Sequence, residues 1–222
     1  MKKIIGLIGR PDYTPLGQEA MVIYNSLRKI VSANDCIPLG ILPVSQNSYL
    51  KNEKEDLDID SFEKILSMCD GFIMQGGDLY YNYDLVAIKY AHNNDIPILG
   101  ICLGMQTMAV YLGGFFTEIK NKKLHKAKNS AEYIHNVIIK EDSFLYSVIG
   151  KKEILVNSLH KDTVTRIPNK YISGTHKETI EAIEDKTKRF FLGIQWHPEY
   201  LNDENSLKIF NIFFKTIKEY QK

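Results

Sequence analysis

Cys102 has the sequence surroundings of a catalytic nucleophile. An apolar run at residues 97–101 leads directly into this cysteine, and a helical pattern follows it at once. Gly100 and Gly104 stand two residues before and after it, which is the spacing of the G-x-S-x-G nucleophile elbow with sulfur in place of oxygen. A tight strand-to-helix turn leaves little room for side chains at those two positions. The following helix would direct its free N–H groups at the sulfur and favour the thiolate.

A histidine and a carboxylate two residues apart supply a candidate base. The apolar run at residues 190–196 ends at His197, and Pro198 favours an extended backbone for the residue before it. Side chains two residues apart in an extended segment point to the same side, so we expect Glu199 to lie beside the imidazole. The carboxylate would fix the tautomer and stabilise the charged ring. We therefore predict Cys102, His197 and Glu199 as a catalytic triad.

Two alternatives remain for this histidine and one for the cysteine. His197 could be a structural residue, or His197 and Glu199 could be metal ligands, although no third ligand is apparent in the sequence. Cys102 could be a buried structural cysteine, which is how we interpret Cys36 and Cys69, because neither has flanking elbow glycines.

A Gly-Gly pair follows another predicted strand, at residues 71–75. Backbone amides at Gly76 and Gly77 could turn toward a ligand and stabilise the negative oxygen of a tetrahedral intermediate. The expected second donor is the amide of Leu103, the residue after the nucleophile. We predict an oxyanion hole formed by Gly77 and Leu103, with Gly76 contacting the substrate. Such a pair is also common as a plain turn.

These residues stand at the ends of elements that alternate along the first half of the chain. The expected strands are residues 3–9, 37–42, 71–75 and 97–101, and the expected helices are residues 15–31, 61–69, 83–93 and 105–112. This order predicts an α/β fold of the flavodoxin-like type, with a mostly parallel central sheet and helices on both faces. The second half predicts a smaller antiparallel sheet near the site. Its expected strands are residues 133–139, 154–156, 179–183 and 190–196, and helices are expected at residues 143–149 and 206–220.

Length and composition exclude several classes of function. The 222 residues suit one domain, which we place at residues 1–222. The formal net charge of +1 argues against a nucleic-acid partner, and we interpret the basic run at residues 120–128 as a solvated loop. The apolar run at the start is too short for a signal peptide, and nothing approaches the roughly 20 apolar residues of a membrane span.

The three cysteines argue against a disulfide framework. Their number is odd and their spacing wide, which favours a reducing cytoplasm. The sequence has no Cys-x-x-Cys pair and no cysteine–histidine cluster with zinc-like spacing, so we predict neither a metal nor a cofactor.

Together these motifs resemble the class I glutamine amidotransferase superfamily. The segment from Gly100 to Gln106 resembles its cysteine motif, the segment from Gly193 to Glu199 resembles its histidine motif, and Gly76 and Gly77 fall where the superfamily has its oxyanion loop. The resemblance covers most of the chain. It implies an enzyme that cleaves a γ-glutamyl amide through a thioester on the cysteine.

Within the superfamily, the chain most resembles the γ-glutamyl-γ-aminobutyrate hydrolase branch. The segments similar to that branch are Val156-Asn157-Ser158-Leu159-His160, His135-Asn136-Val137-Ile138-Ile139 with the following Ser143-Phe144-Leu145, and Ile180-Glu181-Ala182-Ile183-Glu184. By this resemblance, Gln106, Asn157, Ser158 and His160 would lie near the γ-glutamyl group.

The chain departs from that branch at two places. Leu103 stands where the branch usually has arginine, as in many amidotransferase glutaminase units. The stretch after Gly77 is also short, and only Tyr83-Asp84 remains where the branch carries an Arg-Asp pair. The leaving amine is therefore open.

We expect a small γ-glutamyl substrate. One alternative is a glutaminase subunit that passes ammonia to a separate synthetase, and another is a non-catalytic binding protein on the same fold. The sequence leaves the oligomeric state open, a homo-oligomer included.

Overall fold

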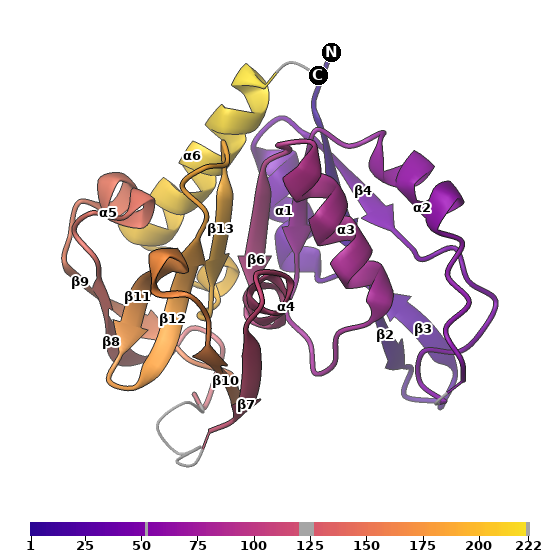
Figure 1. The fold of residues 1–222 in the computed structure, drawn as a ribbon, viewed down its shortest axis with the longest axis horizontal. Helices are drawn as coiled ribbons and strands as arrows, with labels where there is room; N and C mark the ends of the chain where they lie inside the picture. Colours follow the sequence, from indigo (N-terminus) through magenta and orange to yellow (C-terminus); the bar gives the residue numbers. More distant parts are fainter. Residues whose placement is uncertain (52, 120–126, 221–222) are drawn as a thin grey trace.

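The parallel half of the structure carries the first part of the chain. The computed structural model describes residues 1–51, 53–119 and 127–220, and its main sheet runs through the middle of the molecule (Figure 1). Five strands of this sheet are parallel. In order from the edge they are β4 (Ile37–Ile41), β1 (Ile4–Ile8), β5 (Gly71–Met74), β6 (Ile98–Ile101) and β13 (Phe191–Ile194). The predicted mostly parallel α/β fold is confirmed.

The antiparallel half continues the same sheet beyond β13. Its strands are β12 (Thr179–Glu184), β11 (Ile172–His176), β8 (Tyr133–Ile139), β9 (Glu153–Asn157), β10 (Asp162–Arg166) and β7 (Phe115–Glu118). The join is the antiparallel pair of β12 with β13, in which Ile183 lies opposite Gly193. The strand carrying His197 at its end is thus the boundary between the two halves.

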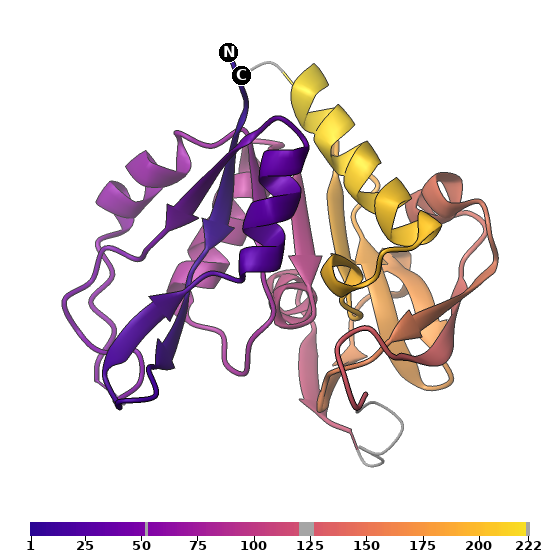
Figure 2. The same cartoon turned by 180° about the vertical axis from the view of Figure 1, so that it is seen from behind.

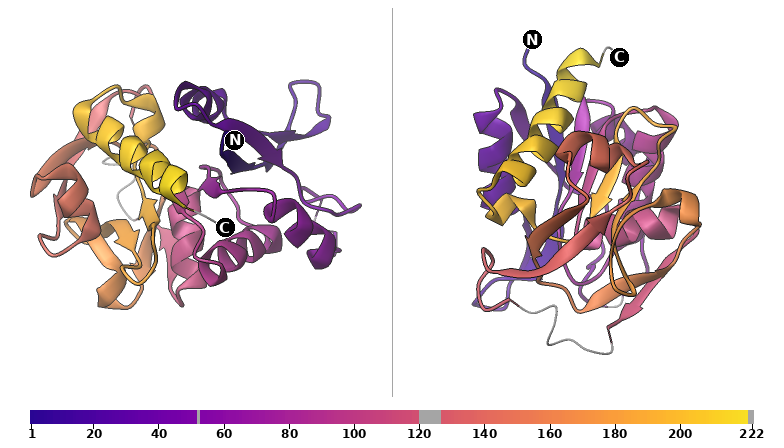
Figure 3. Two further views of the ribbon diagram at one scale, coloured as in Figure 1. Left: turned by 90° about the horizontal axis from the view of Figure 1, so that it is seen from above. Right: turned by 90° about the vertical axis from the view of Figure 1, so that its left-hand side faces the viewer.

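Helices cover both faces of the sheet (Figures 2 and 3). On one face lie α1 (Asn25–Ala33) and α6 (Glu204–Glu219), with the short α5 (Phe144–Ile149) packed against α6. On the other face lie α2 (Ile59–Leu66), α3 (Asn82–Asn93) and α4 (Leu103–Tyr111). The two faces have separate apolar cores, one around Val31 and Phe213 and the other around Phe62 and Ala87. This packing holds β5, β6 and β13 rigidly between two layers of helices.

The helix expected over residues 15–31 is wrong in its first half. Residues 19–22 form β3 (Glu19–Val22), which pairs with β2 (Arg10–Tyr13) in a separate two-stranded sheet, and α1 begins only at Asn25. Gly17 has φ 75°, and its N–H donates to the Thr14 carbonyl at 2.8 Å, so the chain reverses there. The apolar spacing that suggested a helix belongs to a hairpin followed by a shorter helix.

Most of the predicted basic run, at residues 120–126, lies outside the described residues. No helix in the described part of the chain has the length and apolar character needed to cross a membrane.

Candidate functional site

Cys102 occupies a strained turn between β6 and α4. Its backbone has φ 54° and ψ −110°, a region that residues with a side chain rarely adopt. Its N–H donates to the Ile194 carbonyl at 2.8 Å, which fixes the turn to β13. A Cβ added at Gly100 would lie 2.8 Å from the Gly104 carbonyl carbon, and one added at Gly104 would lie 2.2 Å from the Met74 carbonyl oxygen. The turn therefore requires glycine on both sides.

His197 and Glu199 are in direct contact at the end of β13. The Nδ1 atom of His197 lies 2.7 Å from Oε1 of Glu199, and the Glu199 side chain is fully buried. The expected proximity is present, but the expected extended backbone is not. Residues Pro198–Tyr200 form a 3₁₀ turn, and His197 itself has φ −111° and ψ 84°. The turn, and not strand alternation, brings the carboxylate beside the ring.

The electrostatics of the site favour a protonated imidazole. Burial alone would lower the pKa of His197. The negative charges of Cys102 and Glu199, with the hydrogen bond to Glu199, outweigh burial and raise the pKa of His197 to about 10. An imidazolium at neutral pH beside a cysteine sulfur is the arrangement that holds a cysteine as its reactive thiolate.

The Gly-Gly loop lies against both the cysteine and the histidine. A Cβ placed on Gly76 would be 3.0 Å from Cε1 of His197 and 3.6 Å from the Cβ of Cys102. One placed on Gly77 would be 3.1 Å from Cδ2 of Leu103. Leu103 is the first residue of α4, and the first amides of a helix have no acceptor within it. The structure thus brings the predicted oxyanion residues to the predicted nucleophile.

Asn157 contacts the backbone of His197. Its Oδ1 accepts the His197 N–H at 2.8 Å, and its Nδ2 donates to the His197 carbonyl at 2.9 Å. The same Nδ2 also donates to the Ser130 carbonyl at 2.6 Å. The side chain is fully buried, so its amide holds the histidine segment in place.

The other three residues expected near the γ-glutamyl group, Gln106, Ser158 and His160, are buried. Gln106 donates from Nε2 to Oε1 of Gln195 at 3.0 Å and to the Asp162 carbonyl at 3.1 Å. Ser158 is fully buried, and His160 makes a 2.8 Å hydrogen bond with the Asp162 carbonyl through Nδ1. The polar groups of Gln106 and His160 are thus directed to the protein interior.

The sequence did not predict a buried ion pair between Arg10 and Asp84, next to the Gly-Gly loop. The guanidinium of Arg10 lies 2.6 Å from Asp84, with the two side chains only 5% and 0% exposed. Arg10 also donates to the Gln75 carbonyl at 3.3 Å, and its side chain packs against Gly77. The signal that could have identified it is an arginine placed directly after a buried strand.

Gln75 joins this loop to the β2–β3 hairpin. Its Nε2 donates to the Val22 carbonyl at 2.8 Å, and its Oε1 accepts the Tyr24 N–H at 2.9 Å. The ring of Tyr200 stacks on the ring of His197 with centroids 5.6 Å apart. The loop is therefore fixed to the hairpin by Gln75 and lies against Cys102 and His197 through Gly76.

Comparison with known proteins identifies a family and similar sequences. The family model described as Peptidase C26 matches residues 81–199. Two GMP synthases (glutamine-hydrolyzing) are similar in sequence. The one from Mannheimia succiniciproducens is 32% identical over 151 residues, covering 66% of this chain and 28% of its own length. The one from Prochlorococcus marinus is 34% identical over 154 residues, covering 67% of this chain and 27% of its own. This chain spans about a quarter of the length of these relatives.

Solved structures share the fold. The glutaminase domain of Trypanosoma brucei CTPS with bound acivicin superposes with a TM-score of 0.70 at 18% identity, covering 100% of this chain and 96% of that one. A glutamine amidotransferase from Thermotoga maritima superposes with a TM-score of 0.58 at 16% identity, covering 99% of this chain and 85% of that one. At these identities the likeness concerns the fold.

Proposed function

Since the chain belongs to the Peptidase C26 family, we propose that it hydrolyses γ-glutamyl amide bonds through a γ-glutamyl thioester on Cys102. The observation that carries the proposal is the contact set of His197. Its ring is held by Glu199 at 2.7 Å and interacts electrostatically with Cys102, with Gly76 packed against both the ring and the cysteine.

In the first half-reaction the Cys102 thiolate attacks the γ-carbonyl carbon of the substrate. The carbon–sulfur bond forms and the carbonyl oxygen becomes negative, where the amides of Gly77 and Leu103 stabilise it. His197 then gives its proton to the amine nitrogen as the carbon–nitrogen bond breaks. The amine leaves, and the γ-glutamyl group remains on sulfur.

In the second half-reaction water replaces the amine. The now neutral His197 takes a proton from the water, which attacks the thioester carbon, and the carbon–sulfur bond breaks to release glutamate and the thiolate. Glu199 holds the ring in one orientation and stabilises its charged form in both halves. In this proposal Asn157 positions His197 and Gly76 contacts the substrate, while the buried Gln106, Ser158 and His160 support the γ-glutamyl pocket from the protein interior.

A second candidate is a glutaminase that supplies ammonia to a synthetase. One observation favours it: GMP synthases similar to this chain carry the words glutamine-hydrolyzing in their names. Leu103 after the nucleophile, as in many amidotransferase glutaminase units, agrees with it. The chemistry at Cys102 is the same in both candidates, and they differ in the leaving amine and in the need for a partner.

The leaving amine decides between the two candidates. The purified chain is assayed alone on glutamine and on a panel of γ-glutamyl amines, with release of glutamate as the readout. Partner-free turnover of the larger amines supports the γ-glutamyl-amine hydrolase, as in the branch that the sequence resembles. Turnover restricted to glutamine and dependent on an added synthetase supports the glutaminase.

The role of the cysteine is tested with Cys102→Ala, for which Cys36→Ala is the matched control. Cys36 is also buried and free, but it stands directly before β4, whereas Cys102 follows the carboxyl end of β6 at the opposite edge of the parallel strands. We expect Cys102→Ala to abolish both glutamate release and labelling by a thiol-reactive glutamine analogue, while Cys36→Ala retains both. Substantial hydrolysis by Cys102→Ala would disprove the mechanism. A folded parent protein that neither turns over nor takes the label would favour the non-catalytic alternative.

A further inference from the structure

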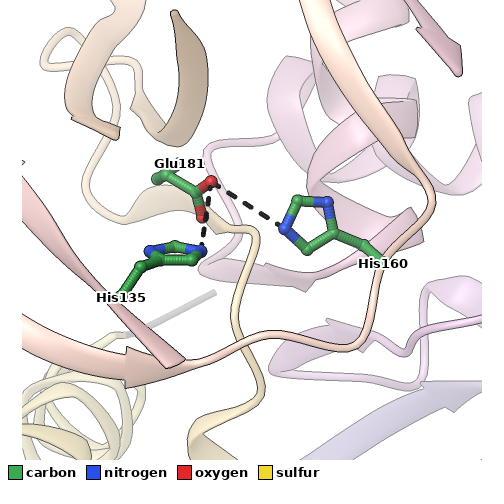
Figure 4. A group of neighbouring side chains, drawn as sticks. All are labelled: His135, His160 and Glu181. Carbon is green, nitrogen blue, oxygen red and sulfur yellow. Dashed lines mark ion pairs between the residues drawn. The ribbon is translucent and has the colours of Figure 1, made fainter. Parts of the chain in front are cut away.

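Two histidines and a glutamate meet in the interior of the antiparallel half (Figure 4). His135 lies on β8, Glu181 lies on β12, and His160 lies in the connection between β9 and β10. Their side chains are 5%, 0% and 1% exposed. The Nε2 atoms of both histidines lie 3.8 Å from the same oxygen, Oε1 of Glu181. One nitrogen or oxygen atom from each residue lies within 4.8 Å of the others.

The distances within this cluster do not suit direct hydrogen bonds. A separation of 3.8 Å between nitrogen and oxygen is too long for one. The hydrogen bond that Oε1 of Glu181 accepts comes instead from the Thr179 hydroxyl, at 2.9 Å. Its second oxygen, Oε2, has no hydrogen-bond partner within the described ranges. The carboxylate is thus buried with little hydrogen-bond compensation.

The hydrogen bond of His160 indicates which of its ring nitrogens faces Glu181. Nδ1 of His160 lies 2.8 Å from the Asp162 carbonyl, which can only accept, so Nδ1 carries the proton. In the neutral ring the lone pair of Nε2 then faces the Glu181 carboxylate. Two acceptors facing each other repel unless a proton or a metal ion lies between them. A histidine that donates one ring N–H to a carbonyl and offers the other nitrogen to a common centre has the geometry of a metal ligand.

We propose that His135, His160 and Glu181 form a binding site for a divalent transition-metal ion, with Zn²⁺ as the best match. Two imidazoles and one carboxylate form a known zinc ligand set, whereas Mg²⁺ and Ca²⁺ prefer oxygen ligands. Ligand atoms on a tetrahedral zinc ion lie roughly 3.4 Å apart, given bonds of about 2.1 Å. The 3.8 Å separations need to close by only a few tenths of an ångström. The sequence did not predict this site, because its three ligands come from distant segments.

The ion would be structural and would stiffen the segments that hold His197. It would join β8, β12 and the β9–β10 connection. That connection begins directly after Asn157, whose amide holds the His197 backbone. On β12, the Glu181 carbonyl accepts the N–H of Gln195, two residues before His197, at 2.8 Å. The site therefore supports the histidine segment from two directions without contacting the cysteine.

Metal titration of the full chain tests this site. Cys102→Ala serves as the parent, because it removes the thiolate that could bind zinc beside His197. After stripping with a chelator, we expect one equivalent of Zn²⁺ per chain. The melting temperature should rise by about 5 °C or more at zinc concentrations near 100 times Kd. Bound Co²⁺ should show the visible absorption of a low-coordinate site without a thiolate charge-transfer band.

Variants on this parent locate the ion. Glu181→Gln keeps the size of the side chain but removes the charge, and we expect it to weaken zinc binding at least about 100-fold, beyond what loss of a supporting contact costs. His160→Asn provides the same comparison if Glu181→Gln fails to fold. The matched control is His92→Gln, which breaks another histidine–carboxylate pair, at 3.0 Å from Asp185, and should leave zinc binding intact.

Three results would overturn the proposal: a stripped parent that takes up no zinc, equal affinity in the parent and in the folded Glu181→Gln or His160→Asn variant, or a cobalt–thiolate band in the parent. The last of these needs no variant of the cluster, so the proposal stays testable even if every cluster variant unfolds.

Discussion

The side-chain amide of Asn157 forms a two-point contact with the backbone of His197. It accepts the His197 N–H at 2.8 Å and donates to the His197 carbonyl at 2.9 Å. The amide thus satisfies both backbone groups of the residue at which the chain turns from β13 into the 3₁₀ turn. This contact assigns Asn157 to positioning of the imidazole, although resemblance alone suggested that it touches the substrate.

Asn157→Ala should therefore lower kcat more than it changes KM. Without the amide the His197 segment can shift, and a misplacement of about 1 Å costs on the order of 100-fold in rate. The two unsatisfied backbone groups should also lower the free energy of unfolding by about 1–3 kcal/mol each. Steady-state kinetics and urea denaturation measure the two effects.

Asn136→Ala is the control for this variant. Asn136 lies on the neighbouring strand β8, is exposed, and bonds Glu153 at 2.6 Å. We expect it to leave kcat unchanged. A raised KM with normal kcat in Asn157→Ala would instead support the substrate contact that the sequence resemblance implies.

Glu199→Gln should shift the alkaline limb of the pH–rate profile to lower pH. The pKa of His197 is raised to about 10, and the Glu199 carboxylate is one of the charges that raise it. As pH rises through this pKa, the imidazolium loses the proton that it must give to the leaving amine, so kcat/KM falls. A neutral amide at residue 199 removes part of the stabilisation of the His197 imidazolium. The fall in kcat/KM should therefore begin at lower pH.

The measurement is kcat/KM across the neutral and alkaline range for both proteins. Glu204→Gln is a suitable control, because Glu204 is also a carboxylate but is exposed and pairs with lysines. An unchanged alkaline limb in Glu199→Gln would show that this carboxylate does not set the charge of His197.

Local sequence signals were sufficient for the parallel half and for the elbow. Strands β1, β4, β5 and β6 are short apolar runs bounded by turn residues. The glycines around Cys102 indicated a lack of space for side chains, which the structure shows directly. The hairpin formed by β2 and β3 was not predicted, because the apolar residues of β3 and of α1 together have the spacing of a single helix. Pro15 and Gly17, both in the turn closed by the Gly17 N–H and the Thr14 carbonyl, were the local signs of the reversal.

Long-range contacts were beyond the reach of the sequence. Strands β7 and β10 are short and partly exposed, and their pairing contains a register shift, so neither shows a clear alternation. Arg10 and Asp84 stand 74 residues apart, and nothing local links them. The His135–His160–Glu181 cluster likewise depends on the packing of three separate segments. Such sites follow from tertiary structure and not from spacing.

Gly76→Ala should reduce activity while the protein remains folded. The added Cβ would lie 3.0 Å from Cε1 of His197, closer than side chains normally approach, so the ring or the loop must move by a few tenths of an ångström. A catalytic pair is sensitive to such shifts, and we expect kcat to fall about 10- to 100-fold. Kinetics and circular dichroism separate loss of rate from loss of fold.

Gly174→Ala is the control, because its added Cβ would also lie 3.0 Å from a neighbour, here the Cβ of Ala182 on β12. The strain in Gly174→Ala should be similar to that in Gly76→Ala, but Gly174 lies on β11, away from Cys102. If both variants lose activity equally, the effect of Gly76→Ala reflects general strain and not its contact with His197.

Asp84→Asn should destabilise the protein strongly. It leaves the Arg10 guanidinium buried without its counter-ion, where the pair lies 2.6 Å apart with side chains 5% and 0% exposed. Removing one partner of such a pair typically costs about 3–5 kcal/mol of unfolding free energy. Urea denaturation measures the loss. Activity should fall as well, because Arg10 holds the Gln75 carbonyl next to the Gly-Gly loop.

Asp78→Asn provides the comparison on the same loop. Asp78 pairs with Lys161 at 2.8 Å, but both side chains are largely exposed, so its loss should cost less than about 1 kcal/mol. Replacing both members of the buried pair, as in Arg10→Met with Asp84→Leu, should be less damaging than Asp84→Asn, because no charge is then left buried. Equal costs for Asp84→Asn and Asp78→Asn would mean that water reaches Arg10 and that the pair does not anchor the loop.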